Sequence, residues 1–499
     1  MMHAVDRAVP AGLSLSRLET GGCPSTAGID DEKMPRLSAS TPLPTDVITP
    51  GYDRASLKPG ILHIGVGAFH RAHQAVYTDA ALAKEFGDWG IVGVSLRSVD
   101  IVHDLRAQDG LYTVIARSGA GDSAQVVGSV VRGLSGTEDR EEILSLMADP
   151  AIRVVTITVT EKAYGYDPAS GGLDRSHPSV AADLADPRAP VGVVGYLVEG
   201  LSRRHAAGLP PFTVLCCDNL PTNGRIVRRL VIEMAGARDP ALANWISGQG
   251  AFPCSMVDRI VPAATEETRA RAERLIGAED ELALDTEPFM QWVIEDHFIS
   301  GRPKWEAGGA LFVGDVEPYE KMKLRLLNGS HSLMAYLGQL HGLTYIRDVI
   351  AVPDYREKVR RHMAAVLQTL DPVPGIDLEA YQAQLVERFS NPGVAHSTRQ
   401  VAMDGSQKLP QRIMLPAVEE LAKGGDASAF AYVLAVWMAY LAKVAEISDP
   451  RAAELKAAAA RSAPDDPSAP FFEIPGLFPR ALVENGAWRA LVNAELEKL

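Results

Sequence analysis

The segment ILHIGVG, residues 61–67, decides the fold that the sequence predicts. It is a short apolar run ending in two glycines, Gly65 and Gly67, which is typical of a buried strand followed by a tight turn. Glycines between a strand and a helix let the backbone approach a pyrophosphate at the helix N-terminus. The third glycine of a G-x-G-x-x-G motif is absent, because position 70 is His70. The segment therefore predicts either a dinucleotide site or a plain strand-to-helix turn.

Similar apolar runs follow this segment along the N-terminal half. Residues 72–86 have apolar positions at helical spacing. Further strands are predicted at residues 91–96, 111–116, 126–131, 152–160 and 212–219. Strands that alternate with helices indicate a mainly parallel sheet covered on both faces.

The C-terminal part has a different pattern, rich in Ala, Leu, Glu and Arg. Helices are predicted at residues 319–341, 354–370, 376–390, 411–423, 427–446, 449–461 and 478–497. We therefore predict an α/β plus all-α protein. Its parts are a loose N-terminal tail over residues 1–56, an α/β domain over 57–312 and an all-helical domain over 313–499. Met34 is an alternative start, since the patterned sequence comes only after it.

Composition excludes several classes of protein. The net charge of −14 and the lack of a basic patch argue against a nucleic-acid partner. Four cysteines in 499 residues, without a CxxC pair, do not form a disulfide framework or a cysteine-based zinc site. The longest apolar stretch, residues 427–442, is shorter than the roughly 20 residues that span a bilayer. We therefore expect a cytoplasmic, soluble protein with no membrane partner.

The stretch EKMKLRLLNGSHSLMAYLG, residues 320–338, carries the strongest candidate for chemistry. In a regular α-helix, Asn328 would lie about 140° and His331 about 80° around the axis from Lys323. One arc would then present an amine, a carboxamide and an imidazole. A buried lysine serves as a general acid or base, and an amide stabilises a developing oxyanion. The alternative is a surface lysine, a satisfied asparagine and a core histidine.

Other polar positions have weaker signals. Asn219 follows a strand at the edge where open α/β sheets bind ligands, although it could also cap the next helix. Asp258 interrupts an apolar run beside Arg259, which an internal ion pair would explain. His70 and His73 lie three residues apart but have no accompanying ligand cluster, so we expect no metal. A G-x-S-x-G nucleophile elbow is also absent, which disfavours an α/β-hydrolase.

The end of the second strand bears on the choice of cofactor. The tip reads Ser95-Leu96-Arg97-Ser98, with no carboxylate before Asp100. An acidic residue there suits the ribose 2′-hydroxyl of NAD, whereas an arginine suits the 2′-phosphate of NADP. Arg97 therefore leaves NADP open beside NAD.

Together these stretches resemble the mannitol dehydrogenase family of polyol-specific long-chain dehydrogenases. The matching segments are GVGAFHRAHQ (65–74), TITVTEKAYGY (156–166), CDNLPTNG (217–224), FPCSMVDRI (252–260), EPFMQWVIED (287–296), YEKMKLRLLNGSHS (319–332) and DGSQKLPQR (404–412). They extend over the chain from about residue 58, and the Lys-x4-Asn-x2-His element is specific to this family.

The resemblance implies that residues 57–312 form a Rossmann-like dinucleotide-binding domain and residues 313–499 a helical substrate domain. It also implies a metal-free, NAD-dependent oxidoreductase, expected to be monomeric, with its site between the two domains. Lys323 would be the acid/base, Asn219 and Asn328 would hold the reacting oxygen, and His331 would bind substrate near the same carbon. The resemblance also implies substrate contacts from Asp258 and Lys408. The implied cofactor contacts are Gly65, Val66, Gly67, Ala68, Phe69, Arg97 and Glu161.

Two branches of the family compete. TEKAY (160–164) and AMDGSQKLPQR (402–412) resemble fructuronate reductases more than mannitol 2-dehydrogenases. Lys162 and Arg399 would then supply positive charge for a substrate carboxylate, unless both are surface charges. The resemblance thus implies reduction of D-fructuronate to D-mannonate, with interconversion of D-mannitol and D-fructose as the alternative. A non-catalytic nucleotide-binding regulator has no need of the Lys323 set, and a zinc-dependent sugar dehydrogenase lacks its ligands here.

Overall fold

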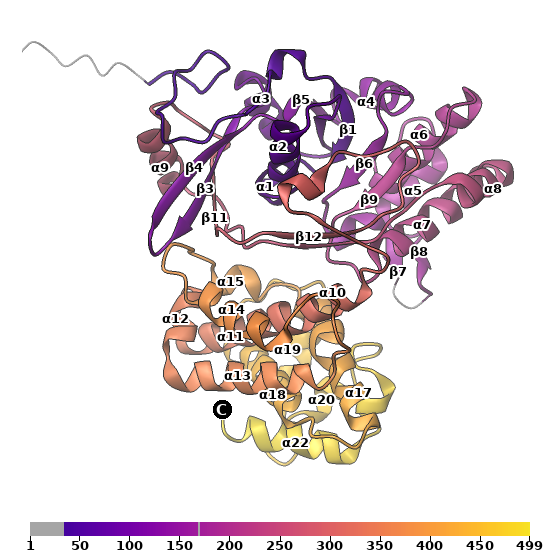
Figure 1. The fold of residues 1–499 in the computed structure, drawn as a ribbon. Helices are drawn as coiled ribbons and strands as arrows, with labels where there is room; N and C mark the ends of the chain where they lie inside the picture. The colour runs from indigo at the N-terminus through magenta and orange to yellow at the C-terminus, as the bar shows by residue number, and fades with distance from the viewer. Residues whose placement is uncertain (1–33, 168–169) are drawn as a thin grey trace, which may run out of the picture. The chain divides into compact units, whose positions relative to one another are not determined.

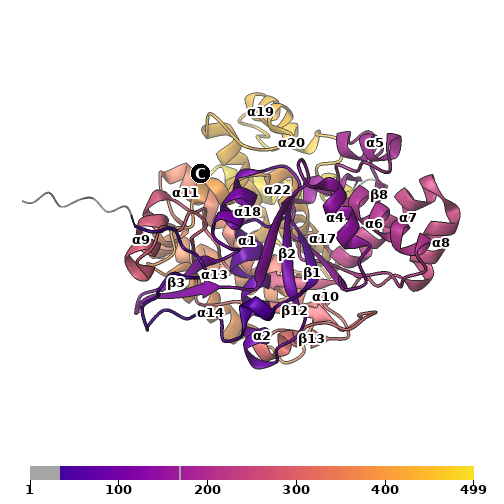
Figure 2. The ribbon, with the colours of Figure 1, turned by 90° about the horizontal axis from the view of Figure 1, so that it is seen from above.

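The predicted strand at residues 61–67 lies at the centre of a five-stranded parallel sheet in the computed structural model, which describes residues 34–167 and 170–499. The strand order is β5–β2–β1–β6–β9, and every pairing is parallel. The strands are β1 (Pro59–Ile64), β2 (Gly90–Ser95), β5 (Val130–Ser135), β6 (Val154–Ile157) and β9 (Thr213–Cys216). The order reverses between β1 and β6, so the loops after β1, β6 and β9 meet at the edge where such sheets bind ligands (Figures 1 and 2).

Successive residues of the strands enter two different cores, as the two-residue period of a strand requires. Leu62 and Ile64 pack in one core with helices α4 (Arg140–Met147), α6 (Val193–Ala206) and α7 (Asn223–Arg238). Ile61 packs in the other with α2 (Gln74–Lys84) and the tryptophans Trp292 and Trp305. The predicted α/β fold is therefore confirmed, but a second sheet helps to cover this face.

That second sheet is not predicted by the sequence pattern. It contains β10 (Ser255–Asp258), β12 (Gln291–Glu295) and β13 (Leu311–Val313). A third sheet joins β3 (Tyr112–Ser118), β4 (Gly121–Val127) and β11 (Leu284–Thr286). The single strand predicted at residues 126–131 is wrong: Gly128 and Ser129 separate β4 from β5, where the chain passes from one sheet to another.

The predicted loose tail does not hold for residues 34–56. Leu37 is fully buried and donates its backbone N–H to the Glu279 carbonyl at 2.8 Å. Ile48 forms a bridge to Gln125 on β4, and Val47 packs in the same small core as Leu37. Residues 1–33 of the predicted tail lie outside the described residues.

The C-terminal part is helical, as predicted. The helices before residue 400 are α10 (Glu317–Met322), a π-helical segment (Lys323–Asn328), α11 (Gly329–His341), α12 (Ile346–Ala351), α13 (Pro353–Leu367), α14 (Leu378–Phe389) and α15 (Thr398–Val401). After it come α16 (Gly405–Leu409), a second π-helical segment (Pro410–Met414), α17 (Leu415–Ala422), α18 (Ser428–Lys443), α19 (Ala452–Ala460), α20 (Ala469–Phe472), α21 (Arg480–Val483) and α22 (Gly486–Leu496). The helix predicted at 478–497 is thus two helices.

Helix α18 forms the centre of this helical part. Phe430, Leu434 and Trp437 are each at most 1% exposed, because α11, α13, α19 and α22 pack around the helix. Within the described residues no helix is both long and apolar enough to cross a membrane.

Candidate functional site

The turn after β1 has the geometry that the glycines predict. Gly65 has φ +101°, and a Cβ there would lie 2.0 Å from the Thr158 carbonyl oxygen, so only glycine fits. A Cβ on Gly67 would meet nothing closer than 3.8 Å, and this residue precedes α1 (Ala68–Ala72) with its backbone exposed. The space in front of Gly67 fits a phosphate group approaching the backbone. Ala68 and Phe69 are half-buried beside it, whereas Val66 is buried.

The Lys323–Asn328–His331 element differs from the α-helix assumed in the sequence analysis. Residues 323–328 form a π-helix, in which hydrogen bonds join residues five apart. This turn is wider than an α-helical turn, so the α-helical spacing assumed for Lys323 and Asn328 does not apply within it. π-Helical turns often occur at functional sites because they redirect side chains.

Lys323 is a buried amine with a neutral hydrogen-bond partner. Its Nζ donates to Asn219 Oδ1 at 2.6 Å, which joins the helical part to the loop after β9. Burial lowers the pKa of Lys323 to about 8, and Arg412 and Arg388 lower it as well, whereas Asp258 acts in the opposite direction. An amine with this pKa exchanges protons near neutral pH, as a general acid/base requires.

Two further polar side chains of this element have unused hydrogen-bonding atoms. Asn328 Oδ1 and His331 Nε2 are buried and have no partner among the described residues. Burial, followed by the charge of His396, lowers the pKa of His331 well below its usual value, so the ring is neutral. Unsatisfied buried polar atoms in a native fold point to a ligand or water.

Asp258 does not pair with its neighbour Arg259, so the expected internal ion pair is wrong. Instead, Arg388 on α14 donates to Asp258 at 2.8 and 2.9 Å and to Glu287 at 2.8 and 2.9 Å. The three side chains are at most 5% exposed. We refer to Asp258, Glu287 and Arg388 as the buried triad; it joins helix α14 to the second sheet and places one carboxylate near Lys323.

The loop after β6 brings two predicted residues to the same region. Lys162 forms an ion pair with Asp404 at 2.7 Å, across to the helical part. Glu161 is exposed, and its charge acts on Lys323, Lys408 and Arg412. Glu161 thus lies close enough to Lys323 for its charge to act there.

Lys408 projects from α16 near the same cluster. Its Nζ has one long contact, 3.5 Å to the Val401 carbonyl, and burial lowers its pKa to about 8. Arg97 and Arg399 are exposed. Arg97 follows β2 as expected, but the charge of Arg399 acts on Tyr440, and the described contacts do not bring Arg399 to Lys323.

Two further charged residues, Glu320 and Arg412, lie at the site without a sequence motif that marks them. Glu320 accepts the Thr222 N–H at 2.9 Å, lines a small cavity with Lys323, and has its pKa raised to about 7 by burial. Arg412 is buried, and its charge acts on Lys323. The only sequence feature that indicates Glu320 or Arg412 is a charged residue within an apolar helical pattern.

The side chains of His70 and His73 contact different partners. His70 stacks on His63 with ring centroids 3.3 Å apart, whereas His73 Nε2 bonds the Gln291 carbonyl oxygen at 2.9 Å. No group of three or more His, Cys, Asp or Glu residues suited to a metal occurs in the described part of the chain. Among the described residues no side chain caps α7, so the alternative role of Asn219 as a cap is wrong. The neighbouring Asp218 carboxylate accepts from Tyr164 Oη at 2.6 Å and from the Val159 N–H.

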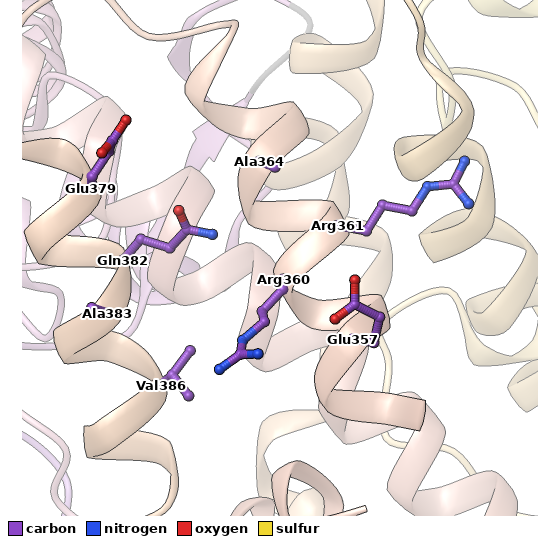
Figure 3. A pocket seen from close by; sticks show the side chains of 8 residues that line it. All are labelled: Glu357, Arg360, Arg361, Ala364, Glu379, Gln382, Ala383 and Val386. Atoms are coloured by element: carbon purple, nitrogen blue, oxygen red, sulfur yellow. The ribbon is translucent and has the colours of Figure 1, made fainter. Parts of the chain in front are cut away.

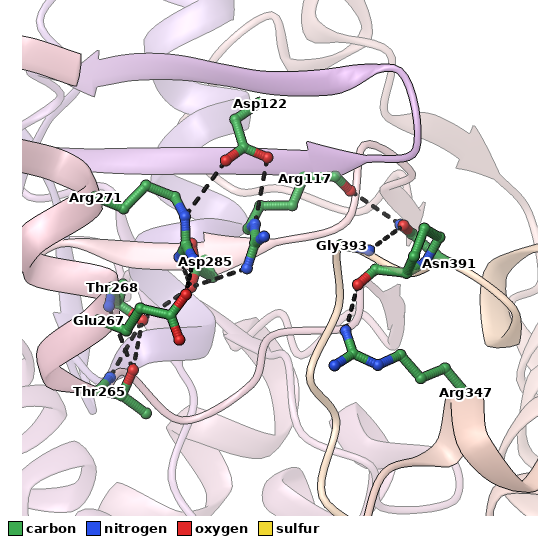
Figure 4. A network of polar contacts seen from close by, with 11 residues as sticks. Arg117, Asp122, Thr265, Glu267, Thr268, Arg271, Asp285, Arg347, Asn391 and Gly393 are labelled. Atoms are coloured by element: carbon green, nitrogen blue, oxygen red, sulfur yellow. Dashed lines mark hydrogen bonds and ion pairs between the residues drawn. The ribbon is translucent and has the colours of Figure 1, made fainter. Parts of the chain in front are cut away.

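A polar network holds the loop that precedes α15 against the N-terminal part (Figure 4). Asn391 Nδ2 donates to the Arg117 carbonyl at 2.9 Å, and Arg347 donates to the Pro392 carbonyl. The same loop continues to His396, whose ring lies edge-on to His331 with centroids 5.1 Å apart. Contacts of the small third sheet thus help to set the wall of the site.

A separate groove of about 580 Å³ lies between α13 and α14. Arg360, Arg361, Glu357, Glu379 and Gln382 line it, together with Ala364, Ala383 and Val386 (Figure 3). None of the predicted site residues lies among them, so this groove is distinct from the site around Lys323.

Comparison with known proteins shows which family the chain belongs to. Residues 59–307 match the family model described as the mannitol dehydrogenase Rossmann domain, and residues 315–498 match the mannitol dehydrogenase C-terminal domain. The chain is 43% identical over 467 residues to D-mannonate oxidoreductase of Escherichia coli, covering 91% of this chain and 96% of that protein. It is 39% identical to mannitol 2-dehydrogenase of Phaeosphaeria nodorum, covering 95% and 84% respectively.

A solved structure shows the same architecture. The ternary complex of Pseudomonas fluorescens mannitol 2-dehydrogenase with NAD and D-mannitol superposes with a TM-score of 0.87 at 37% identity, covering 93% of this chain and 96% of that one. Because the two family models together cover most of the chain, and these relatives exceed 30% identity over nearly its full length, this protein belongs to the mannitol dehydrogenase family of oxidoreductases.

Proposed function

We propose that this enzyme reduces the C2 carbonyl of D-fructuronate to the hydroxyl of D-mannonate with NADH and without a metal. The observation that carries the oxidoreductase chemistry is the buried Lys323 amine, 2.6 Å from Asn219 and on the same element as Asn328 and His331. The choice of a sugar acid is supported by the similarity to D-mannonate oxidoreductase over 91% of the chain.

The turn at Gly65–Gly67 fits the pyrophosphate of the dinucleotide, with Ala68 and Phe69 beside it and Arg97 at the end of the next strand. Bound NADH would supply the hydride for the carbonyl carbon. Arg97 has the chemistry to contact a ribose 2′-phosphate, so NADPH is the cofactor to test beside NADH. The monomeric state and the cytoplasmic location stay predictions.

The residues of the site then act on the substrate oxygen. The Lys323 ammonium donates a proton from Nζ to the oxygen as negative charge develops there. Asn219 accepts a hydrogen bond from Lys323 and so fixes the direction of Nζ, while its own amide N–H groups are free to donate to the same oxygen. Asn328 supplies a second amide donor. In the reverse reaction neutral Lys323 removes the hydroxyl proton.

The second candidate is a mannitol 2-dehydrogenase. The similarity to the Pseudomonas fluorescens enzyme, whose structure contains NAD and D-mannitol, favours this alternative. The two candidates share the Lys323 chemistry and differ in whether the substrate bears a carboxylate.

A substrate comparison tests the proposal. The absorbance at 340 nm is followed with D-fructuronate and with D-fructose, each with NADH and NADPH. We expect D-fructuronate with NADH to give the highest kcat/KM, and dialysis against EDTA to leave that rate unchanged. A preference for D-fructose would move the enzyme to the mannitol branch, and restoration of lost activity by zinc would contradict the metal-free mechanism.

The pH dependence is expected to have opposite signs in the two directions. Reduction requires protonated Lys323, whose pKa is about 8, so its kcat/KM should be constant below pH 8 and fall about tenfold per unit above it. Oxidation requires the neutral amine, so its kcat/KM should rise with pH and level off above about 8. Steady-state assays between pH 6 and 10 measure both profiles; equal signs in the two directions would contradict the assignment.

A further inference from the structure

The helical part of the chain buries three arginines, and they differ in their partners. Arg388 binds the two carboxylates of the buried triad. Arg325 binds both oxygens of Glu419, at 2.6 and 2.7 Å. Arg412 is the exception, because it has no carboxylate partner among the described residues.

The hydrogen bonds of Arg412 go to neutral acceptors and use only one of its nitrogens. Nη1 donates to the Asn328 carbonyl at 3.3 Å and to Ser332 Oγ at 3.1 Å. Nε and Nη2 have no hydrogen-bond partner in the described part of the chain. The residue is nevertheless buried, with only 8% of its surface exposed. The guanidinium therefore keeps an edge with unused N–H groups.

This edge belongs to the site around Lys323. The π-helical segment 410–414, which carries Arg412, packs against the π-helical segment 323–328. The charge of Arg412 acts on Lys323, on His331 and on Lys408, which projects from the preceding helix.

A buried charge without a counter-ion in contact is unfavourable unless a ligand supplies one. The exposed Glu161 acts on Arg412 through its charge but forms no ion pair with it in the described structure. Burial lowers the pKa of Arg412 only to about 10, so the group stays charged at neutral pH. The planar guanidinium edge matches the two oxygens of a carboxylate. Lys408, with its single contact of 3.5 Å, offers a second cation beside it.

We propose that Arg412 binds the carboxylate of the substrate, with Lys408 as the second cation, and so makes the enzyme select sugar acids over neutral sugars. This assignment rests on the proposed sugar-acid substrate and deepens it. It transfers the carboxylate-binding role from Lys162, which is paired with Asp404, and from the exposed Arg399.

The kinetic test compares Arg412→Met and Arg412→Lys with the wild type. In Arg412→Met the KM for D-fructuronate should rise at least about 30-fold, because a carboxylate loses its buried charged partner. The affinity for NADH should stay within about threefold, and the kcat/KM for D-fructose should fall much less than that for D-fructuronate, because only the acid loses a charged partner. Arg412→Lys keeps the charge but not the planar edge. Its KM for D-fructuronate should therefore lie between those of the wild type and Arg412→Met. Arg360→Met, in the groove between α13 and α14, is the matched control and should leave all values unchanged.

A binding measurement makes the outcome independent of turnover. Calorimetric titration of D-mannonate and D-mannitol into the NADH complex compares the affinity for an acid with that for its neutral counterpart. Both ligands are alcohols, so neither reacts with the reduced cofactor. The wild type should bind D-mannonate more tightly, and Arg412→Met should lose that preference while its thermal unfolding still shows a folded protein. An unchanged preference in Arg412→Met and Arg412→Lys would overturn the inference.

The same data separate this inference from the proposed function. In one outcome the wild type reduces D-fructuronate and Arg412→Met retains the preference for acids. That result overturns the role of Arg412 and leaves the proposed reaction standing. In another outcome the wild type does not reduce D-fructuronate but binds D-mannonate more tightly than D-mannitol, and Arg412→Met loses this preference. That result overturns the proposed reaction and supports carboxylate binding by Arg412. Equal loss of activity on acid and neutral substrates in Arg412→Met would show a structural role and contradict the inference.

Discussion

Lys323→Ala is expected to lower kcat for carbonyl reduction by about 10²- to 10⁴-fold, the usual contribution of a positioned general acid. The affinity for NADH should stay within about twofold, because the glycine turn after β1 is formed by other elements. Single-turnover reduction followed at 340 nm measures the chemical step, and a fluorescence titration with NADH measures binding.

The chain offers a matched control for this prediction two residues earlier. Lys321 is half-exposed and pairs with Glu317 at 2.7 Å on the surface of the same helix. Lys321→Ala should therefore keep normal turnover. Methylamine should restore part of the rate of Lys323→Ala, since a small amine fits the space that the side chain leaves. Normal turnover in Lys323→Ala would exclude it as the acid/base.

Arg388→Met should lower the free energy of unfolding by about 3–5 kcal/mol, the usual cost of removing one partner from a buried charged cluster. The substitution leaves Asp258 and Glu287 buried without their cation, each at most 2% exposed. The triad joins α14 to the second sheet, so the loss should affect the contact between the helical part and the N-terminal part. Urea unfolding followed by circular dichroism and tryptophan fluorescence measures the change.

A surface ion pair gives the comparison for Arg388→Met. Arg461 and Glu473 are 2.9 Å apart and about 60% exposed. Arg461→Met should change the free energy of unfolding by less than about 1 kcal/mol, because water screens the pair. A change of this small size in Arg388→Met would mean that solvent reaches the triad.

Local patterns in the sequence predict much of the fold and some of the site. β1 and its glycine turn follow from a run of seven residues, and α18 follows from its continuous apolar pattern. Lys323, Asn328 and His331 are recognisable because they lie within nine residues of one another. Such features depend on neighbours in the sequence.

The features that the sequence did not predict depend on distant partners. Arg388 is 130 residues from Asp258 and 101 from Glu287, and no local pattern pairs them. Arg325 pairs with the carboxylate of Glu419 in the folded protein, whereas Arg412 bonds the neutral hydroxyl of Ser332, and no local pattern distinguishes the two arginines. The local pattern around Leu37 predicts a loose tail, because the backbone hydrogen-bond partner of Leu37, Glu279, lies far along the chain. Contacts between residues distant in sequence therefore determine which charges pair, whereas local patterns determine where helices and strands form.

The π-helical turn at residues 323–328 constrains changes in the length of this protein. An i→i+5 turn holds one residue more than an α-helical turn, so an in-frame deletion of one codon within it would let the segment relax to a regular α-helix. Asn328 would then be the fourth residue after Lys323 and would lie about 40° from it around the axis, still on the same side of the helix. A one-residue deletion between Asn328 and His331, in the regular helix that follows, would instead rotate His331 by about 100° relative to both. A one-residue gap in a related sequence therefore disrupts the site when it falls after Asn328, and the π-helical turn absorbs it when it falls before.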